Sequence, residues 1–385
     1  MIQPKLALPL SAALLLFAAL ACEPTAATPD DPDPWQWQLP DGFPEPFVPA
    51  DNAMSAAKVE LGRYLFYDVR ISGNQTFSCG SCHDQAKGFA DGKALPEGST
   101  GDIVPRNAMS LANVAYFPTY TWANPNLELL EQQARVPIFG EHPVELGATG
   151  HEDEILARFA ADADYQERFA AAFPGETDPT TFDNIVFAIA SFERTLISGN
   201  SPYDDYLYGA NASAISPAAK RGFELFFSER LECYHCHAGL NLAAAFFALD
   251  SSQRELAFFN TGLYNIDGAG AYPEPNVGLY AFTGEATDMG RFRASSLRNI
   301  EVTGPYMHDG SIETLEEVID FYAAGGRELT EGAHIGDGRE SPYKDPLVRG
   351  FELSEGEKLD LLAFLHSFTD QQFLTDPAFS DPFAD

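Results

Sequence analysis

The sequence is poor in basic residues, with 23 lysines and arginines against 57 aspartates and glutamates in 385 residues. The resulting formal net charge of −34 argues against nucleic-acid binding, because a phosphate backbone is neutralised by lysine and arginine. Adsorption to an anionic lipid surface is disfavoured for the same reason. We therefore expect contact with a membrane only through a lipid anchor.

Long apolar runs are also lacking after the first 21 residues. Residues 1–21 are predicted to be a signal peptide, with a short positive region, an apolar run and a small-residue cleavage site. Cys22 would then begin the mature chain, followed by a tether and N-terminal segment over residues 22–50. We expect a periplasmic protein anchored to the outer membrane by a lipid on Cys22. The alternative is cleavage that leaves a free thiol there.

Cysteine is scarce, and four of the five cysteines fall in two C-x-x-C-H motifs. The motif residues are Cys79, Cys82 and His83, and then Cys233, Cys236 and His237. Two thiols at this spacing reach the two vinyl groups of one porphyrin, and the next histidine binds the iron. The added histidine argues against a thioredoxin-like redox pair, and the lack of clustered partner ligands argues against a zinc site. The sequence thus predicts two covalent c-type haems.

Each motif is preceded by a similar stretch, residues 56–66 before the first and residues 217–227 before the second. Both stretches show apolar residues at helical spacing and end in x-G-x-x-[LF]-F. This internal repeat predicts two cytochrome c-like domains, an N-terminal one over residues 51–210 and a C-terminal one over residues 211–385. We expect a mainly α fold with one covalent haem in each domain, long loops and little strand.

Five more segments show helical apolar spacing, namely residues 126–135, 151–172, 181–198, 314–324 and 354–368. Ser354 and Glu357 are expected to form a capping box for the last of these helices. Residues 199–217 and 262–290 are rich in glycine and proline and are predicted to be loops, of which the first links the domains.

The sequence resembles the bacterial di-haem cytochrome c peroxidase and MauG superfamily over about residues 50–370. Its markers besides the haem motifs are Pro-Arg-Asn at 105–107, Leu-Arg-Asn at 297–299 and the block at 303–310. The resemblance implies that the N-terminal haem reacts with peroxide and that the C-terminal haem handles electrons. It also implies a calcium ion between the domains, with Asn107, Thr303 and Pro305 among its ligands.

The position 14 residues after His308 is a methionine ligand of the second haem in ordinary peroxidases, whereas this sequence has Tyr322. MauG-type enzymes likewise have tyrosine there. A thioether raises the haem potential, whereas a phenolate lowers it and stabilises higher oxidation states. The resemblance implies that Tyr322 and His237 bind the second iron and that His308 lies beside this haem, bonded to a propionate. The alternative for Tyr322 is a core aromatic residue on a helix.

The loop at residues 97–102 lacks the distal histidine of the peroxidases, so we expect the first haem to be open on its distal side. By resemblance, Gln133, Pro137 and Glu145 belong to this distal pocket, and Glu145 moves a proton between the peroxide oxygens. Trp122 matches a tryptophan that carries a hole between the two haems. The alternatives are a surface helix cap for Glu145 and a core residue for Trp122.

Within the superfamily, residues 113–116, 121–125 and 190–199 are similar to the MbnH-type di-haem enzymes. This resemblance implies a peroxidase-family oxidoreductase that uses hydrogen peroxide to form a bis-Fe(IV)-like state. It would then oxidise an aromatic residue, tryptophan, of a partner such as an MbnP-like copper-binding protein. Leu231 replaces the surface tryptophan from which MauG passes holes to its substrate, so the exit route is expected to differ.

Two other functions are compatible with the motifs. A di-haem cytochrome c peroxidase would reduce hydrogen peroxide with electrons from a small cytochrome or cupredoxin. A non-enzymatic electron-transfer protein would hold both irons six-coordinate and would not react with peroxide.

Overall fold

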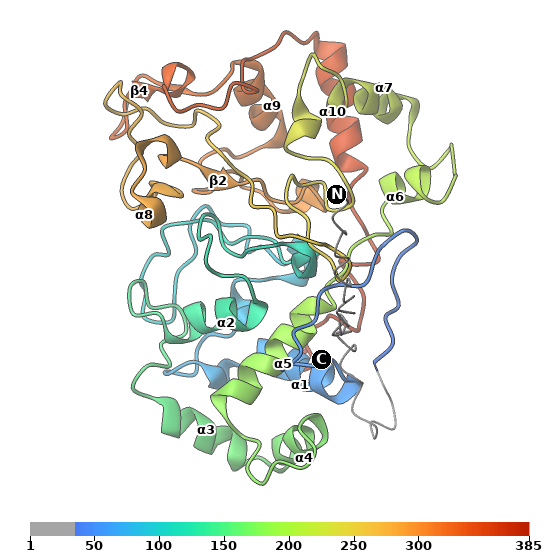
Figure 1. Ribbon diagram of the computed structural model, residues 1–385, viewed down its shortest axis with the longest axis vertical. Helices are drawn as coiled ribbons and strands as arrows, with labels where there is room; N and C mark the ends of the chain where they lie inside the picture. The colour runs from blue at the N-terminus through green and yellow to red at the C-terminus, as the bar shows by residue number, and fades with distance from the viewer. Residues whose placement is uncertain (1–34, 385) are drawn as a thin grey trace, which may run out of the picture. The chain divides into compact units, whose positions relative to one another are not determined.

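The structure, a computed structural model, describes residues 35–384. The predicted signal peptide, the lipid attachment at Cys22 and the beginning of the tether lie outside these residues. The described chain is mainly helical, and its strands form two short antiparallel pairs (Figure 1). The pairs are β1 (Phe258–Phe259) with β2 (Phe292–Arg293), and β3 (Glu328–Leu329) with β4 (Gly336–Asp337). The predicted mainly α fold with long loops and little strand is confirmed.

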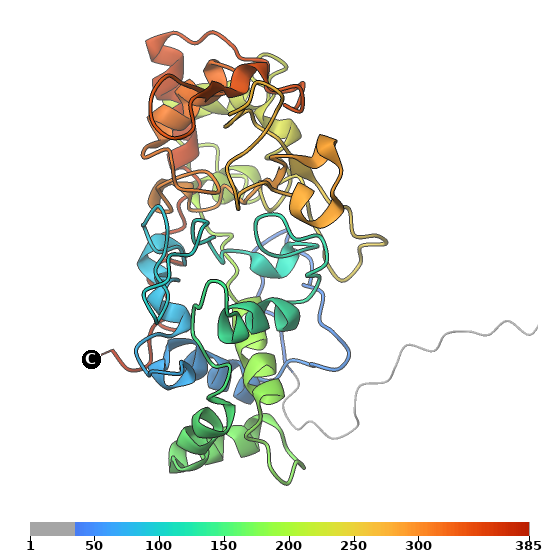
Figure 2. The same cartoon turned by 90° about the vertical axis from the view of Figure 1, so that its left-hand side faces the viewer.

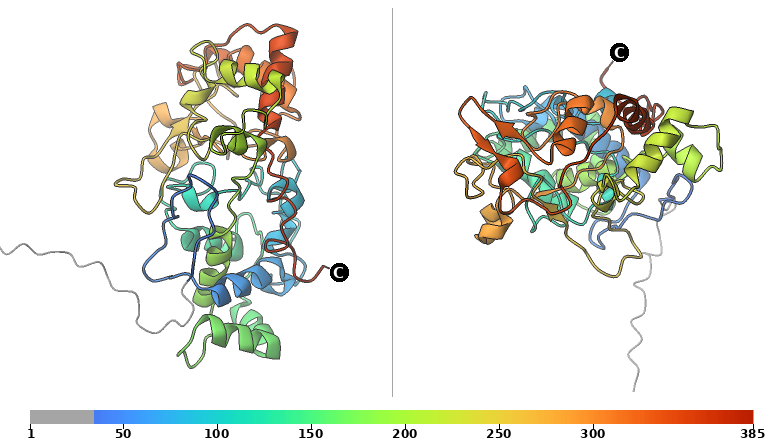
Figure 3. Two further views of the ribbon diagram at one scale, coloured as in Figure 1. Left: turned by 90° about the vertical axis from the view of Figure 1, so that its right-hand side faces the viewer. Right: turned by 90° about the horizontal axis from the view of Figure 1, so that it is seen from above.

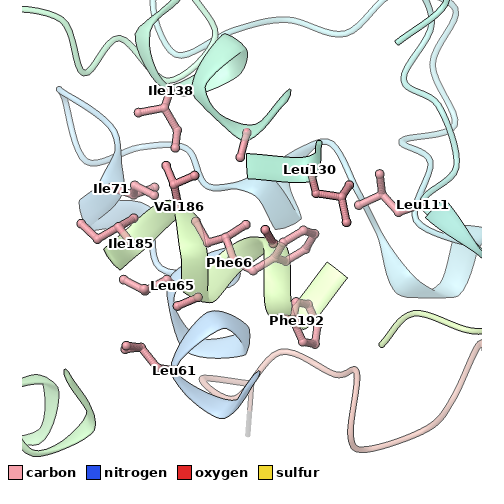
Figure 4. Close-up of a cluster of buried hydrophobic side chains, with 14 of the residues drawn as sticks. Leu61, Leu65, Phe66, Ile71, Leu111, Leu130, Ile138, Ile185, Val186 and Phe192 are labelled. Carbon is pink, nitrogen blue, oxygen red and sulfur yellow. The ribbon is translucent and has the colours of Figure 1, made fainter. Parts of the chain in front are cut away.

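Five of the described helices lie in the same half of the molecule (Figures 1 and 2). They are α1 (Ala56–Tyr67), α2 (Leu130–Phe139), α3 (Glu152–Ala160), α4 (Ala163–Ala172) and α5 (Phe182–Arg194). Helix α5 packs along α1 and also contacts α2. The core between these helices is filled by apolar side chains such as Leu61, Leu65 and Phe66 of α1 (Figure 4). Ile185 and Phe192 of α5 complete it from the other side.

The later helices lie in the other half of the molecule (Figures 1 and 2). They are α6 (Pro202–Leu207), α7 (Pro217–Phe226), α8 (Tyr280–Thr283), α9 (Leu315–Ala323) and α10 (Glu355–His366). Helix α7 packs along α10, which also contacts α9. Phe226, Leu361 and Phe364 lie in the core of this half. Each motif is thus supported by a pair of crossing helices.

The glycines of the internal repeat lie where these helix pairs cross. A Cβ atom on Gly62 would lie 1.9 Å from the carbonyl oxygen of Ala188 in α5. A Cβ atom on Gly222 would lie 2.1 Å from the carbonyl oxygen of Asp360 in α10. Only glycine allows backbones to approach this closely, so the repeated glycine marks the same helix crossing in both halves.

The end of the chain returns to the first half of the molecule (Figure 3). Phe373 is 2% exposed and belongs to the same core as α1 and α5. The hydroxyl of Tyr67 donates a hydrogen bond to the carbonyl of Phe379, at 2.8 Å. The C-terminal segment therefore ties the second half of the chain to the first.

The helix predicted over residues 151–172 is wrong as a single element, because the structure divides it into α3 and α4. The side chain of Asp162 accepts a hydrogen bond from the backbone of Asp164 and caps α4. Such a cap satisfies the free amides of a new helix start and thus ends the preceding helix. The helix predicted over residues 126–135 is shifted, since α2 begins and ends four residues later.

The loops predicted over residues 199–217 and 262–290 are wrong in part, since α6 and α8 lie within them. Helix α6 is capped by Ser201 and has Pro202 in its first position, a combination that favours a helix start. The other predicted helices are confirmed as α1, α5, α7, α9 and α10, and Ser354 caps α10 as expected.

Residues from Trp35 onward form one compact unit. The division into domains over residues 51–210 and 211–385 stays a prediction. Within the described part of the chain, no helix is both long enough and apolar enough to cross a membrane.

Candidate haem sites

The first C-x-x-C-H motif begins on a short 3-10 turn at Cys79–Ser81. The Nδ1 atom of His83 lies 2.7 Å from the carbonyl oxygen of Phe89. A carbonyl can only accept, so Nδ1 carries the proton and Nε2 keeps its lone pair. Burial lowers the pKa of His83 and keeps the ring neutral. A neutral imidazole with a free Nε2 atom is the form that binds haem iron.

The second motif has the same arrangement, with a 3-10 turn at Cys233–His235. The Nδ1 atom of His237 lies 3.2 Å from the carbonyl oxygen of Leu242, and burial lowers the pKa of this histidine to about 4. The four motif cysteines form no disulfide among residues 35–384. Both motifs therefore present two thiols and one neutral imidazole in the form that haem attachment needs.

Each motif opens into a large cavity. The first motif lines a cavity of about 1910 Å³, and the second lines a cavity of about 1390 Å³. The two thiols and the neutral imidazole that line each cavity fit a covalently attached porphyrin.

The predicted distal residues line the first cavity. Gln133 and Pro137 extend from α2, and Glu145 comes from the loop that follows it. This loop is tied to the helix because the amide of Leu146 donates to the carbonyl of Pro137, at 2.9 Å. Burial raises the pKa of Glu145. A carboxyl held at a cavity wall with a raised pKa is suited to accept and return a proton.

The loop without histidine also reaches the first cavity. Glu97 and Gly98 line it, and the amide of Ser99 donates to the carbonyl of Glu145, at 2.7 Å. A Cβ atom on Gly98 would lie 1.9 Å from the carbonyl oxygen of Val144, so the two loops are in close contact. The structure thus places the loop over residues 97–102 beside the predicted acid–base residue.

Tyr322 lines the second cavity together with the motif residue His237. Helix α9 positions the tyrosine, and a capping box between Thr314 and Glu317 fixes the start of this helix. Burial raises the pKa of Tyr322, so loss of its proton requires a nearby cation. A ferric iron in this cavity would provide that positive charge.

His308 lies in the wall of the second cavity and is 4% exposed. Its ring stacks on Phe292 with centroids 3.7 Å apart, and burial lowers its pKa to about 4. The Nε2 atom has no hydrogen-bond partner among the described side chains and backbone. Its geometry is compatible with the expected bond to a haem propionate.

Trp122 and Arg293 are the two residues of the described chain that line both cavities. The backbone amide of Arg293 in β2 donates to the carbonyl of Trp122, at 2.8 Å. The indole nitrogen of Trp122 donates to the carbonyl of Asn107, also at 2.8 Å. The tryptophan is therefore fixed at the boundary between the cavities, where a hole carrier would have to lie.

The predicted calcium ligands belong to neighbouring loops. The amide of Asn107 donates to the carbonyl of His308, at 2.9 Å, which places this asparagine beside the block that contains Thr303 and Pro305. The side-chain nitrogen of Asn107 donates to the carbonyl of Lys93, at 2.8 Å, so the amide oxygen is left to bind a cation. These neutral oxygens fit the ligand preference of calcium.

His142, Glu193 and Arg293 also line the first cavity, and the sequence predicted no role for them. His142 is exposed at the cavity. Glu193 is 5% exposed, burial raises its pKa to about 8, and its Oε2 atom has no hydrogen-bond partner among the described residues. Glu193 lies on the apolar face of the helix predicted over residues 181–198, and a charged residue in such a place indicates a functional role. No local pattern singles out Arg293.

Two large cavities, each with two thiols and a neutral histidine, define a di-haem c-type redox protein. The sequence model of the di-haem cytochrome c peroxidase family matches residues 56–212. The cytochrome-c peroxidase IdrP1 of Denitromonas iodatirespirans is 33% identical over 95% of this chain and 94% of its own. The methylamine utilization protein MauG of Methylorubrum extorquens is 32% identical over 86% of this chain and 83% of its own.

Comparison with solved structures identifies proteins of the same kind. A MauG-like protein associated with microbial copper homeostasis is 51% identical, with a TM-score of 0.89 over 91% of this chain and 100% of its own. The diheme peroxidase BthA from Burkholderia thailandensis has the same fold, with 20% identity and a TM-score of 0.63 over 86% of this chain and 90% of its own. The chain belongs to the di-haem cytochrome c peroxidase and MauG family, and it is a haem-dependent oxidoreductase with two c-type haems.

Proposed function

We propose that the protein uses hydrogen peroxide to oxidise a tryptophan of a partner protein. The observation that carries this proposal is Tyr322, which lines the second cavity with His237. A tyrosinate ligand would lower the potential of this haem and make it a poor relay for ordinary electrons. When bound, the two haems supply the redox chemistry with peroxide.

The residues of the first cavity have separate roles in this reaction. Glu145 accepts a proton from peroxide and returns it to the departing oxygen, for which its raised pKa is suited. Gln133 orients the peroxide by hydrogen bonding, and Pro137 limits the space above the ring. Trp122 carries the oxidising equivalent between the two cavities, since it lines both of them.

The proposed partner is a copper-binding protein of the MbnP type. It is supported by the 51% identity to a MauG-like protein associated with microbial copper homeostasis. We further propose a periplasmic location, with a lipid on Cys22 that holds the enzyme at the outer membrane. Calcium bound by Asn107, Thr303 and Pro305 would stabilise the loops beside Trp122.

A second candidate function is peroxide reduction with electrons from a small cytochrome or cupredoxin. It is favoured by the position of Met307, which lines the second cavity and could offer a thioether to the iron. The relative named cytochrome-c peroxidase IdrP1 also supports it. The second cavity therefore contains a tyrosine that favours oxidation of a partner protein and a methionine that favours peroxide reduction.

Mass spectrometry of the partner separates these functions. We expect a gain of oxygen at one tryptophan of the MbnP-like protein after incubation with enzyme and hydrogen peroxide, and slow turnover with a reduced cytochrome donor. Tyr322→Phe should abolish the tryptophan product, whereas the control Met307→Leu should retain it. Fast donor oxidation with an unmodified partner would establish the peroxidase function instead.

A further inference from the structure

Arg293 differs from the other buried arginines of the described chain. Arg194 is 3% exposed and lies 2.5 Å from a carboxylate oxygen of Glu131. Arg298 is 1% exposed and lies 2.9 Å from a carboxylate oxygen of Asp204. Burial of a charge is costly unless an opposite charge compensates for it, and these two pairs follow that rule.

No aspartate or glutamate among residues 35–384 compensates Arg293, although it is only 6% exposed. One terminal nitrogen donates to the carbonyl of Thr119 at 3.2 Å, and the other lies 3.3 Å from the sulfur of Met109. Among the described residues, the Nε atom of Arg293 has no hydrogen-bond partner. The guanidinium lies over the ring of Phe117, 3.9 Å from its centroid. These contacts are neutral and leave donors of the guanidinium unused.

Burial lowers the pKa of Arg293 to about 10, and no acidic side chain opposes this effect. A cation in such a place requires an anion that the described protein residues do not provide. In a chain with a net charge of −34, acidic partners are abundant, so their absence here indicates that another molecule fills this position.

The surroundings of Arg293 show which anion this is. Met109 and Tyr120, which lie close to the guanidinium, line the first cavity. The anionic groups of a haem are its two propionates, and a carboxylate accepts two parallel hydrogen bonds from one guanidinium. A propionate of the first haem would supply the missing charge at this site.

We propose that Arg293 binds a propionate of the haem attached through Cys79 and Cys82. The pair of guanidinium and propionate is neutral, and it lies at the boundary where Trp122 lines both cavities. An uncompensated cation at this boundary would oppose removal of an electron from the indole. Arg293 is thus a positioning residue that orders the first haem, and the propionate in turn offsets the positive charge beside Trp122. The inference rests on the haem attachment sites and is independent of the identity of the substrate.

Redox titration and resonance Raman spectroscopy of the purified di-haem protein test this inference without peroxide or a partner. Arg293→Met should lower the midpoint potential of the first haem, because a nearby positive charge favours the reduced iron. It should also shift the propionate bending band of that haem. Arg293→Lys should leave the midpoint potential of the first haem close to the wild-type value, because the positive charge is kept. It should still shift the propionate band, since one ammonium cannot replace the two parallel hydrogen bonds. Arg291→Gln, two positions earlier and 41% exposed, should change neither quantity.

The inference is overturned if Arg293→Met carries both haems and leaves the first potential and the propionate band unchanged. A change confined to the second haem would contradict the assignment to the first. If Arg293→Met does not assemble, an unchanged propionate band in Arg293→Lys overturns the inference. Because all readouts come from the resting protein, they stay valid whatever the outcome of the tryptophan oxidation experiment.

Discussion

The two cavities carry different reactive side chains. The first contains the half-buried carboxyl of Glu145 and the buried carboxyl of Glu193, and the second contains the phenol of Tyr322 and the imidazole of His308. Burial raises the pKa of both carboxyls, which favours their neutral forms. Proton transfer is therefore best supported at the first cavity, and iron ligation by tyrosine at the second.

Glu145→Gln should slow the reaction with hydrogen peroxide by roughly 10²–10⁴-fold, because the amide cannot accept a proton. In the wild-type protein the rate should fall as the pH is lowered through the raised pKa of Glu145, since the ionised form is the base. Stopped-flow spectroscopy measures both effects. A variant that reacts at the wild-type rate would remove Glu145 from the mechanism.

Glu193 makes stability depend on pH. Its pKa in the folded protein is about 8, above the usual value, so the folded state favours the protonated form. This contribution to stability is complete below the ordinary glutamate pKa and is lost as the pH rises to about 8. Between those limits the stability of the wild-type protein should fall with rising pH by roughly 1 kcal/mol per pH unit relative to that of Glu193→Gln. Denaturation curves of both proteins across this range check the difference, and parallel curves would contradict it.

Residues of the site differ in how well the sequence predicts them. The motif thiols and histidines are neighbours in the chain, so their spacing reveals the chemistry directly. Tyr322 and Glu145 were predicted through resemblance, because only their distance from other motifs marks them. Arg293 could not be predicted, because its unusual property is the lack of a partner, which only the folded chain shows.

At the level of secondary structure, the repeated helix pairs explain the internal repeat. Gly62 and Gly222 permit α1 to approach α5 and α7 to approach α10. The sequence predicted these helices because each has an apolar face at helical spacing. It did not predict the break between α3 and α4, because the cap at Asp162 interrupts an apolar pattern that continues on both sides.

Replacement of either crossing glycine by alanine should destabilise the protein. The new methyl group would lie about 2 Å from a carbonyl oxygen of the opposite helix, and such overpacking costs roughly 1–3 kcal/mol or more. Gly356→Ala is the matched control, because nothing lies within 4 Å of a Cβ atom there. Alanine at this helical position should be neutral or stabilise by up to about 1 kcal/mol. Equal stability of Gly62→Ala and Gly356→Ala in urea denaturation would refute the close crossing.

At the level of the whole molecule, the two halves are connected by the returning C-terminal segment. Phe373 lies 5.6 Å from the ring of Phe89, next to the first haem motif, although it follows the second motif in the chain. Nothing in the local sequence indicates this contact, because it depends on the path of the entire chain. Leu231 is 4% exposed and lines the second cavity, so this position offers no surface from which a hole could leave.

Phe373→Ala should reduce the free energy of unfolding by about 3–5 kcal/mol, because it leaves a cavity in the first core. Phe383 in the same segment is 49% exposed, so Phe383→Ala should cost much less. Thermal unfolding followed at the absorbance of the haems compares the two variants. If both have the same midpoint, the segment does not contribute to the core.

If Tyr322 binds the second iron, we expect the second haem to take part in the reaction with peroxide. An EPR spectrum of the ferric protein, before and after one equivalent of hydrogen peroxide, tests it most directly. We predict one high-spin and one low-spin haem at rest, with the signals of both lost after peroxide. Two low-spin signals that peroxide leaves unchanged would contradict the account, as would a reaction confined to the high-spin haem.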